Sequence, residues 1–296
     1  MILPAAGPLA AALAYVLWGL FPLYIKQIAA VPALEIVAHR SWWSFVFVAL
    51  LLAASRRLAW LPQVLAQPRV LAAFALSALL LSGNWLIYVW AVNAGRVLDA
   101  SLGYFINPLL NVMLGYLVLH ERPRPAQWAA VALAGTGVLW LALGSGHVPW
   151  VSLVLAATFG FYGLLRKTAA LGATEGLALE TLMQAPLAAG YLAFLAWQGQ
   201  AAFARGDGAT DAWLLLAGPF TAVPLLLFAF GARRVTLATL GLLQYLGPSI
   251  QFLLGVFIYH EPFDGRRGLG FALIWTALLV YSADGWRVLR RQRQTG

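Results

Sequence analysis

Hydrophobic residues in this chain gather into runs of about twenty, the length at which an α-helix crosses the hydrocarbon core of a bilayer. Polar segments that carry Arg, Pro and Gly separate these runs, most clearly at 55–69 and 198–211. Gly144, Gly146 and Pro149 mark a hinge near the middle of the chain. The pattern predicts ten membrane-spanning helices, at 8–28, 34–54, 70–93, 99–119, 125–143, 150–165, 174–197, 212–231, 237–259 and 265–286.

The strongest pattern in the sequence is a segment that occurs twice. The first copy, Arg96 to Glu121, reads RVLDASLGYFINPLLNVMLGYLVLHE, and the second, Arg234 to Glu261, reads RVTLATLGLLQYLGPSIQFLLGVFIYHE. Both copies begin with R-V-x-x-A-[ST]-L-G and end with P-x-x-[NQ]-x-x-L-G-x-x-x-x-H-E, and the second has two additional residues between these parts. A match of this length indicates an internal duplication.

The duplication divides the chain into two units, 8–143 and 150–286, which are followed by a basic tail, 287–296. Each unit contains five predicted helices. Because five is an odd number, the second unit crosses the membrane in the opposite sense to the first, as in the inverted repeats of secondary transporters. The predicted fold is therefore an all-α polytopic membrane protein with ten transmembrane helices in two inverted five-helix repeats. The starts of the two units also agree, since Trp18-Gly19 parallels Phe159-Gly160.

Composition supports a membrane protein and excludes several other classes. The chain is 62% hydrophobic and 10% charged, whereas an average soluble domain is about 25% charged. It contains no cysteine, which excludes disulfide scaffolds, thiol nucleophiles and cysteine-based metal sites. No segment resembles a P-loop, a dinucleotide fingerprint, HExxH or a nucleophile elbow. The formal net charge of +9 comes from residues that flank the apolar runs, so it does not indicate nucleic-acid binding.

The basic residues orient the predicted helices. With the N-terminus inside, most of the 19 Lys and Arg fall on the cytoplasmic side. The exceptions are Lys26, Arg40, Arg96, Arg205, Arg266 and Arg267. By the positive-inside rule we expect both termini in the cytoplasm. The first apolar run lacks the basic segment that precedes a signal-peptide core, so we expect it to be retained as a span.

Four segments carry a family resemblance: PALEIVAHRSWWS (Pro32 to Ser44), GNWLIYVWAVN (Gly83 to Asn93), ASLGYFINPLLN (Ala100 to Asn111) and TLGLLQYLGPSIQFLL (Thr239 to Leu254). Together they closely resemble the EamA family of the drug/metabolite transporter superfamily, over essentially the whole chain. The resemblance implies a ten-helix permease of two EamA-type repeats in the bacterial inner (plasma) membrane, which moves a small metabolite or drug-like solute. The members that it resembles are associated with chloramphenicol sensitivity, and that association does not assign a drug as the physiological substrate.

Polar and aromatic residues within the predicted spans are the candidates for a substrate site, since an intramembrane polar group needs a partner or a cavity. Tyr104, Asn107 and Asn111 share one helical face, and Gln244 and Gln251 are the counterparts of Tyr104 and Asn111 in the second copy. An amide both donates and accepts, so such a face suits a small polar or zwitterionic solute. The whole predicted substrate-binding set is Trp18, Asn84, Trp85, Tyr88, Tyr104, Asn107, Asn111, Tyr162, Gln244 and Gln251. For each residue the alternative is a purely structural hydrogen bond to a neighbouring helix.

Charged residues near the ends of two spans are candidates for gating or a proton relay. Glu35, His39 and Arg40 cluster at the start of the second predicted span, and Glu180 occupies the position of His39 in the other unit. A carboxylate beside a histidine suits proton transfer, because histidine titrates near neutral pH. The alternative is a salt-bridged gate or an interfacial cap.

Pro108 and Pro248, one in each copy of the duplicated segment, are the predicted hinges, since proline interrupts the hydrogen-bond ladder of a helix. The His-Glu pairs at 120–121 and 260–261 end the two copies, and we interpret them as structural endings. The inverted repeat places these pairs on opposite sides of the membrane, which argues against a shared metal site. We expect no metal and no cofactor.

Three function classes stay open, and a secondary carrier is favoured. A membrane-embedded enzyme is disfavoured because the sequence offers no convincing nucleophile and base. A non-transporting regulatory or scaffold protein is the other alternative, and it is disfavoured because the chain has no soluble domain and no long loop. The expected partners are a small-molecule substrate and the lipid bilayer, with no nucleic acid; a homodimer is compatible with the sequence, which leaves the oligomeric state open.

Overall fold

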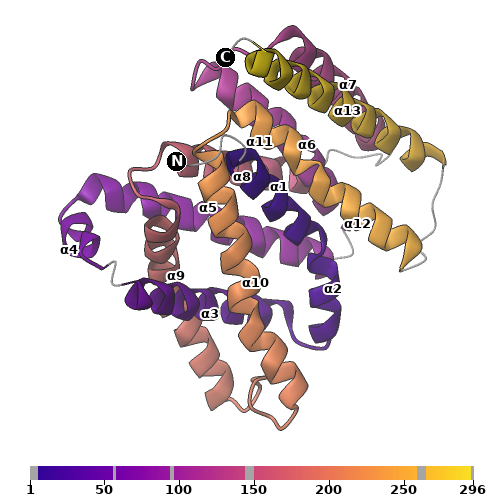
Figure 1. Cartoon of the computed structure of the whole chain (residues 1–296). Coiled ribbons are helices and arrows are strands. Elements are labelled where there is room, and N and C mark those ends of the chain that lie inside the picture. The colour runs from indigo at the N-terminus through magenta and orange to yellow at the C-terminus, as the bar shows by residue number, and fades with distance from the viewer. Residues whose placement is uncertain (1–5, 56–57, 94–96, 144–149, 259–264, 295–296) are drawn as a thin grey trace.

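The computed structural model describes residues 6–55, 58–93, 97–143, 150–258 and 265–294, and every regular element in these ranges is a helix (Figure 1). The apolar runs become helices because a helix satisfies all its backbone groups internally where no water is at hand. The elements are α1 (Ala6–Gly19), α2 (Phe21–Ile25), the 3₁₀ helix η1 (Lys26–Ile28), α3 (Ala33–Ala54), α4 (Trp60–Leu65), α5 (Pro68–Asn93), α6 (Val97–Leu117), α7 (Pro125–Leu143), α8 (Trp150–Thr168), α9 (Ala173–Trp197), α10 (Gly208–Ala232), α11 (Leu237–Gln244), α12 (Leu246–Phe257) and α13 (Gly265–Gln294).

The helices follow the predicted spans, with two differences in the polar segments. The segment 55–69 was predicted as a loop, and this was wrong for its middle part, Trp60–Leu65, which forms α4. Val64 stabilises α4 because it is buried against Phe74 and Leu179. At the other end of the chain, α13 continues past the predicted boundary at 286 as far as Gln294, because arginine and glutamine are good helix formers. The predicted hinge at 144–149 lies outside the described residues.

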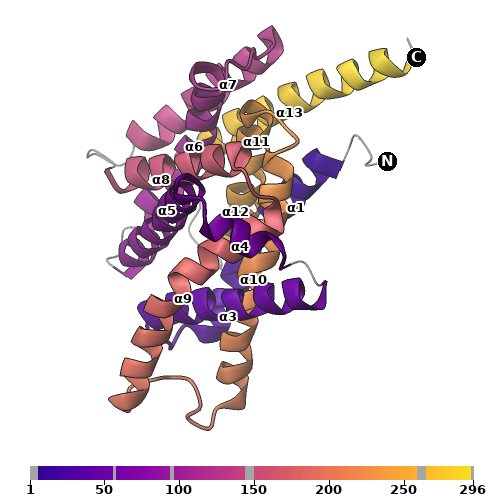
Figure 2. The same ribbon diagram turned by 90° about the vertical axis from the view of Figure 1, so that its left-hand side faces the viewer.

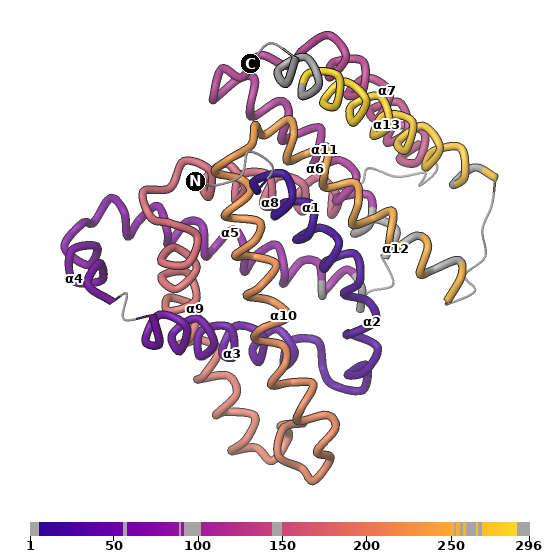
Figure 3. Tube along the Cα trace, viewed as in Figure 1, coloured from indigo at the N-terminus to yellow at the C-terminus, as the bar shows by residue number. Residues whose placement is uncertain are grey.

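Proline accompanies both interruptions of the predicted spans. A proline has no N–H, so the carbonyl four residues earlier loses its helical partner. Pro22 follows the break at Leu20 between α1 and α2, and Pro248 follows the break at Tyr245 between α11 and α12 (Figure 3). Pro108, the duplicate of Pro248, lies inside the continuous helix α6. The same proline position therefore accompanies a break in one copy of the duplicated segment and a continuous helix in the other.

Seven stretches of the described chain are long and apolar enough to cross a membrane. They are Ala6–Ile28, Ala33–Ala54, Pro68–Tyr88, Pro125–Leu143, Ala173–Trp197, Gly208–Ala232 and Gly268–Val288. The other three predicted spans correspond to α6, to α8 with Arg166 and Lys167 in its last turn, and to the interrupted pair α11 and α12. Large apolar side chains point outward from the helices, as Leu187 does at 81% exposure. The chain is therefore a multi-pass helical membrane protein.

Helices of the first predicted unit pack against helices of the second. α7 packs along α13, α3 contacts both α9 and α10, and α6 contacts both α8 and α11 (Figures 1 and 2). The contacts occur in reciprocal sets. α1 contacts α10 and α12, while α8, which holds the place of α1 in the second unit, contacts α5 and α6. Exchanging the two predicted units therefore maps these helix contacts onto one another.

The largest buried cluster lies where α1, α8 and α10 meet. Tyr162 stacks on Phe228 with ring centroids 5.8 Å apart, and Tyr15 meets Phe228 edge-on at 6.1 Å. All three side chains are at most 2% exposed. This cluster joins the first predicted unit to the second and forms the packed floor of the site described next.

Candidate functional site

A cavity of about 500 Å³ lies between the two predicted units. Sites for small organic ligands have volumes of about 300–1,000 Å³. The lining comes from α1, α2, α3, α5 and α6 on one side and from α8, α10, α11 and α12 on the other. Its polar side chains are Tyr15, Lys26, Arg40, Asn84, Tyr88, Tyr104, Thr221, Gln244 and Gln251.

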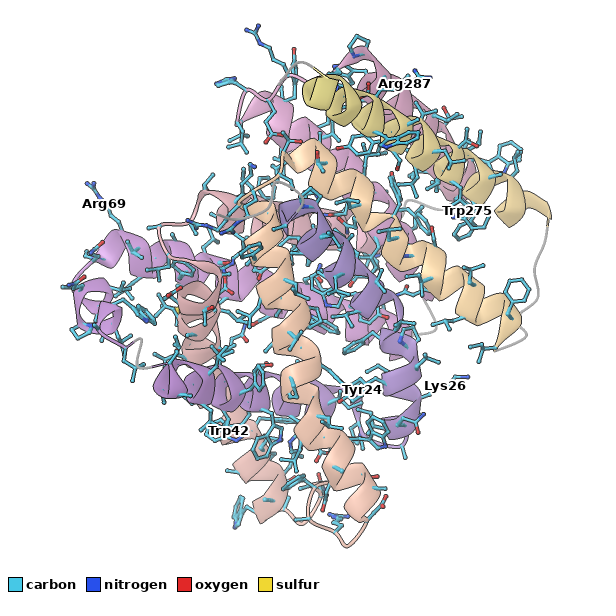
Figure 4. The ribbon with its side chains drawn as sticks, in the orientation of Figure 1. Tyr24, Lys26, Trp42, Arg69, Trp275 and Arg287 are labelled. Atoms are coloured by element: carbon cyan, nitrogen blue, oxygen red, sulfur yellow. The ribbon has the colours of Figure 1, made fainter. Side chains whose placement is uncertain are left out.

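The cavity reaches the surface at Lys26 and Ala29, which are both exposed and which we call the mouth. Figure 4 shows Lys26 at the edge of the molecule, beside α2. At the other end the lining residues Tyr15 and Phe159 are buried and pack onto the aromatic cluster of Tyr162 and Phe228. The cavity is therefore open to the surface at the mouth and closed by packed side chains at the floor.

Aromatic side chains make up much of the wall. Phe21 contacts Trp85, Trp85 contacts Tyr88, and Tyr88 contacts Tyr104, with ring centroids 5.7 to 5.8 Å apart. Trp18 meets Phe159 edge-on at 5.6 Å. Trp18 and Phe159 hold equivalent places in the two predicted units, so the two predicted units meet at this pair.

Arg40 is the charged residue that lies deepest in the wall. It stands two turns into α3 and is 4% exposed, and its guanidinium carbon lies 4.2 Å from the centroid of the Trp85 ring. This is cation–π geometry. Its Nε has no hydrogen-bond partner.

Three amide side chains line the cavity and also bond to neighbouring helices. Asn84 donates to the carbonyl of Leu155 at 3.0 Å, which ties α5 to α8. Gln251 donates to the carbonyl of Trp18 at 3.2 Å. This is the carbonyl that Pro22 leaves without a helical partner, so Gln251 of one unit satisfies a broken helix of the other. Gln244 accepts from Asn111 at 3.3 Å. These three amides therefore line the cavity and also bond between helices.

Three predicted substrate-binding residues do not line the cavity. Asn107 is fully buried and donates to the carbonyl of Ala156 in α8 at 2.6 Å. Asn111 donates to the side chain of Asn107 at 3.1 Å, and Tyr162 lies in the packed floor. Asn107 and Asn111 thus bond between helices, as the structural alternative proposed. They reach the cavity only through Gln244.

Glu35 and His39 lie outside the cavity lining, on a different face of α3 from Arg40. Glu35 is fully buried and accepts from the backbone N–H of Ala202 at 2.6 Å, while its Oε1 lies 3.8 Å from Nε2 of His39. His39 Nδ1 accepts from the indole N–H of Trp43 at 3.1 Å. This cluster ties the start of α3 to the loop after α9.

Glu180, the counterpart of His39, belongs to a separate charged cluster at the far side of the floor. It accepts a hydrogen bond from Ser77 of α5, and its Oε1 lies 3.7 Å from Nη1 of Arg166. Glu180 and Arg166 are 0% and 1% exposed. Gly176 of α9 permits this pair, because a Cβ there would lie 2.1 Å from Nη1 of Arg166.

Glu121, the acidic residue of the first His-Glu pair, forms a second ionic contact on this side. Both carboxylate oxygens of Glu121 accept from the backbone N–H of Leu237, at 2.8 and 3.0 Å, so Glu121 caps the start of α11. Oε1 of Glu121 also lies 3.5 Å from Nζ of Lys167. The contacts agree with the interpretation of this pair as a structural ending. The second pair, 260–261, lies outside the described residues.

The proline positions differ in their relation to the cavity. Pro248 is part of its lining, whereas Pro108 packs against Gly241, where a Cβ would lie 2.6 Å from the Pro108 carbonyl oxygen. In the described part of the chain no group of three or more His, Asp or Glu gathers as a metal site.

Sequence reasoning did not select the wall residues Tyr15, Phe21, Lys26, Phe159 and Thr221. For Phe159 a signal was present, since the internal duplication pairs it with Trp18, which was selected. Tyr15 stands one turn before Trp18 on the same face of α1 and contacts it at 5.7 Å. Thr221 gave no signal, because one hydroxyl in an apolar run does not reveal what it faces.

Comparisons with known proteins identify relatives over nearly the whole chain. Residues 5–143 match the profile of the EamA-like transporter family. An uncharacterized transporter of Pseudomonas aeruginosa is 49% identical over 96% of this chain and 95% of its own length. The protein RarD of Escherichia coli is 43% identical, with 96% of each chain covered. A crystal structure of a protein that is 22% identical superimposes with a TM-score of 0.71 over 93% of this chain and 96% of the other, so the fold is shared.

Proposed function

The chain belongs to the EamA-like transporter family, and from that premise we propose that it is a secondary transporter of a small metabolite or drug-like solute. Transport proceeds by alternating access between two inverted five-helix repeats, at 8–143 and 150–286. The observation that carries this proposal is the cavity between the repeats, which opens at the mouth and ends at a packed floor.

Two further observations support the repeat architecture. The duplicated segment supplies α6 to one unit and α11 with α12 to the other. The helix contacts form reciprocal sets under exchange of the units. Substrate sites of inverted-repeat transporters lie near the midplane, where the repeats meet.

The ionic contacts beyond the floor suit a gate that opens when the repeats move. Ser77 of the first unit binds Glu180 of the second, and Glu121 caps α11 and pairs with Lys167. Opening this side requires that these contacts separate, while the helices around the mouth approach one another. Such a two-state exchange around a fixed site is alternating access.

The proposal includes the location and orientation of the chain. It lies in the bacterial inner membrane with both termini in the cytoplasm, because most basic residues then face inward. In this orientation the mouth faces outward, since Lys26 is on the outer side. The basic segment at the end of α13 then forms a cytoplasmic tail.

The test is uptake of a mixed metabolite pool into proteoliposomes, analysed by mass spectrometry, with and without a pH gradient. Chloramphenicol belongs in the pool because of the association noted for the family. Selective, saturable uptake supports a carrier, and its response to the gradient decides whether protons are coupled. Uptake equal to that of empty liposomes for every solute would overturn the proposal and favour a non-transporting membrane protein.

The absence of cysteine from the natural chain provides a control on the route. Gln251→Cys places a thiol on the cavity wall, and Ser44→Cys places one in the α3 and α10 interface, where Ser44 binds the Gly218 carbonyl. A membrane-impermeant thiol reagent should stop flux through the first variant and leave the second active. Continued flux through fully labelled Gln251→Cys would place the route elsewhere.

A further inference from the structure

Arg40 carries a charge that no acidic residue of the described chain compensates. Its guanidinium carbon lies over the Trp85 ring, and no ion pair joins it to an Asp or Glu among the described residues. Burying an ion without a counter-ion is costly, and an ionisable residue inside a membrane protein indicates a functional site.

The charged side chains on the described cavity wall are both cationic. Two cations line it, Lys26 at the mouth and Arg40 deeper in, and its described lining contains no Asp and no Glu. A surface of one sign with low-dielectric walls concentrates ligands of the opposite sign. An anion is therefore attracted into this cavity and meets no carboxylate of the described lining.

The geometry of Arg40 suits a carboxylate. The guanidinium carbon lies over the Trp85 indole, 4.2 Å from the ring centroid. The N–H groups at the edge of a guanidinium plane match the two oxygens of a carboxylate. The surrounding wall is aromatic, with Trp18, Phe21 and Tyr104 among its members, and suits an apolar group.

We propose that the cavity selects organic monocarboxylates with an apolar body, whose carboxylate binds Arg40 while the aromatic wall holds the body. This inference rests on the proposed transport function and adds a substrate class to it. Arg40 is the buried cation of the described wall, whereas Lys26 is exposed at the mouth, so a dicarboxylate or a phosphate dianion bound at Arg40 would bring a second charge that Arg40 does not balance. A zwitterionic amino acid would bring an ammonium group for which the described wall offers no acid.

Three probes with the same phenyl-bearing body separate these possibilities: 3-phenylpropanoate, its neutral amide 3-phenylpropanamide, and the zwitterion phenylalanine. Binding to the purified full-length protein in detergent is measured by isothermal titration calorimetry. The acid offers Arg40 a charged carboxylate, whereas the amide offers a neutral carbonyl. We therefore expect the acid to bind about 10- to 100-fold more tightly than the amide. Phenylalanine should bind more weakly than 3-phenylpropanoate.

Variants assign the preference to Arg40. Arg40→Gln should reduce the acid-to-amide ratio to about one, since both ligands then meet a neutral partner. Arg40→Lys should retain part of the ratio, because the charge remains and the planar fork is lost. Arg69→Gln is the matched control. Arg69 is exposed at the start of α5 and points away from the molecule in Figure 4, so this variant should keep the full ratio.

Some outcomes would overturn the proposal. They are an amide that binds as tightly as the acid in the natural chain, a ratio that survives Arg40→Gln, or no binding by any of a series of alkyl and aryl monocarboxylates. If Arg40→Gln does not fold, the ratio measured on the natural chain decides, because it needs no variant. The binding measurement and the transport measurement test different claims, so each claim can be refuted without the other. Carboxylate binding that depends on Arg40 without flux would refute the transport function alone, and saturable flux of neutral solutes that ignores carboxylates would refute the substrate class alone.

Discussion

Two arginines of the described chain are buried, and their surroundings differ. Arg166, 1% exposed, lies against the carboxylate of Glu180 and donates to the carbonyl of Ala173 at 3.0 Å. Arg40, 4% exposed, lies against an indole ring and an open cavity, with no carboxylate within ion-pair distance among the described residues. Both charges are withdrawn from bulk water, but only one of them has a protein counter-ion.

This difference separates a structural charge from a functional one. A buried ion whose partner is part of the protein stabilises the arrangement of its helices, and removal of either partner leaves an uncompensated charge. A buried ion that faces a cavity leaves its partner to be supplied by a ligand, and sites of this kind are held at some cost in stability. The comparison therefore predicts opposite responses of stability and binding at the two positions.

The largest effect is expected for Arg166→Gln. The variant leaves the carboxylate of Glu180 buried without its cation, so the free energy of unfolding should fall by about 3–5 kcal/mol. Unfolding of the purified variant in detergent measures this loss. Arg69→Gln, the exposed control, should change the free energy of unfolding by no more than about 0.5 kcal/mol. Equal losses in the two variants would show that the buried pair does not stabilise this region.

The double variant Arg166→Gln with Glu180→Gln measures the interaction between these two side chains directly. Because the second substitution removes the orphaned charge, the double variant should be about 1–3 kcal/mol more stable than the sum of the two single losses predicts. The same unfolding measurement on the natural chain, both single variants and the double variant gives this coupling energy. Strict additivity would mean that the 3.7 Å separation of Arg166 and Glu180 carries no interaction.

Hydrophobic run length made the helices predictable, because a run that fills the bilayer has no alternative structure there. The breaks within spans were harder to foresee. Pro22 and Pro248 accompany breaks and Pro108 does not, so proline alone does not decide. At the first break, the Gln251 side chain of the other unit binds the carbonyl that Pro22 leaves free. That partner is distant in sequence, and no local pattern reveals it.

The candidate site was predictable to the extent that polar residues in spans must find a partner or a cavity. Helical periodicity placed Tyr104 and Asn107 on one face, but the helix that packs against that face decides which of them meets the cavity. At Gly160 the close approach of α8 brings its backbone onto Asn107, whose Nδ2 lies 3.2 Å from where a Cβ would be. Arg40 stands next to His39 in sequence, yet adjacent residues of a helix point about 100° apart. The cluster therefore divides between the cavity and the loop after α9.

A smaller effect is expected for Glu121→Gln. Its carboxylate caps α11 through the N–H of Leu237 and pairs with Lys167, and both side chains are partly exposed. Since a glutamine keeps one acceptor oxygen but no charge, the free energy of unfolding should fall by about 1–2 kcal/mol. Hydrogen exchange gives the local readout, because the amide of Leu237 should exchange faster. Glu175→Gln, in the first turn of α9, should leave that amide unchanged, and equal acceleration in both variants would refute the cap.

The smallest effect on stability is expected at Arg40. This position gives the most direct test of the contrast between the two buried arginines. Arg40→Gln removes the stacking of the guanidinium on Trp85, a cation–π interaction of about 0.5–2 kcal/mol. It also removes the cost of burying a cation that lacks an acidic partner, which is of opposite sign and at least as large. The free energy of unfolding, measured in detergent without ligand, should therefore be unchanged or higher. A loss as large as that of Arg166→Gln would show that Arg40 is held by the protein itself. Unchanged stability together with lost carboxylate binding would show that its counter-ion is the ligand.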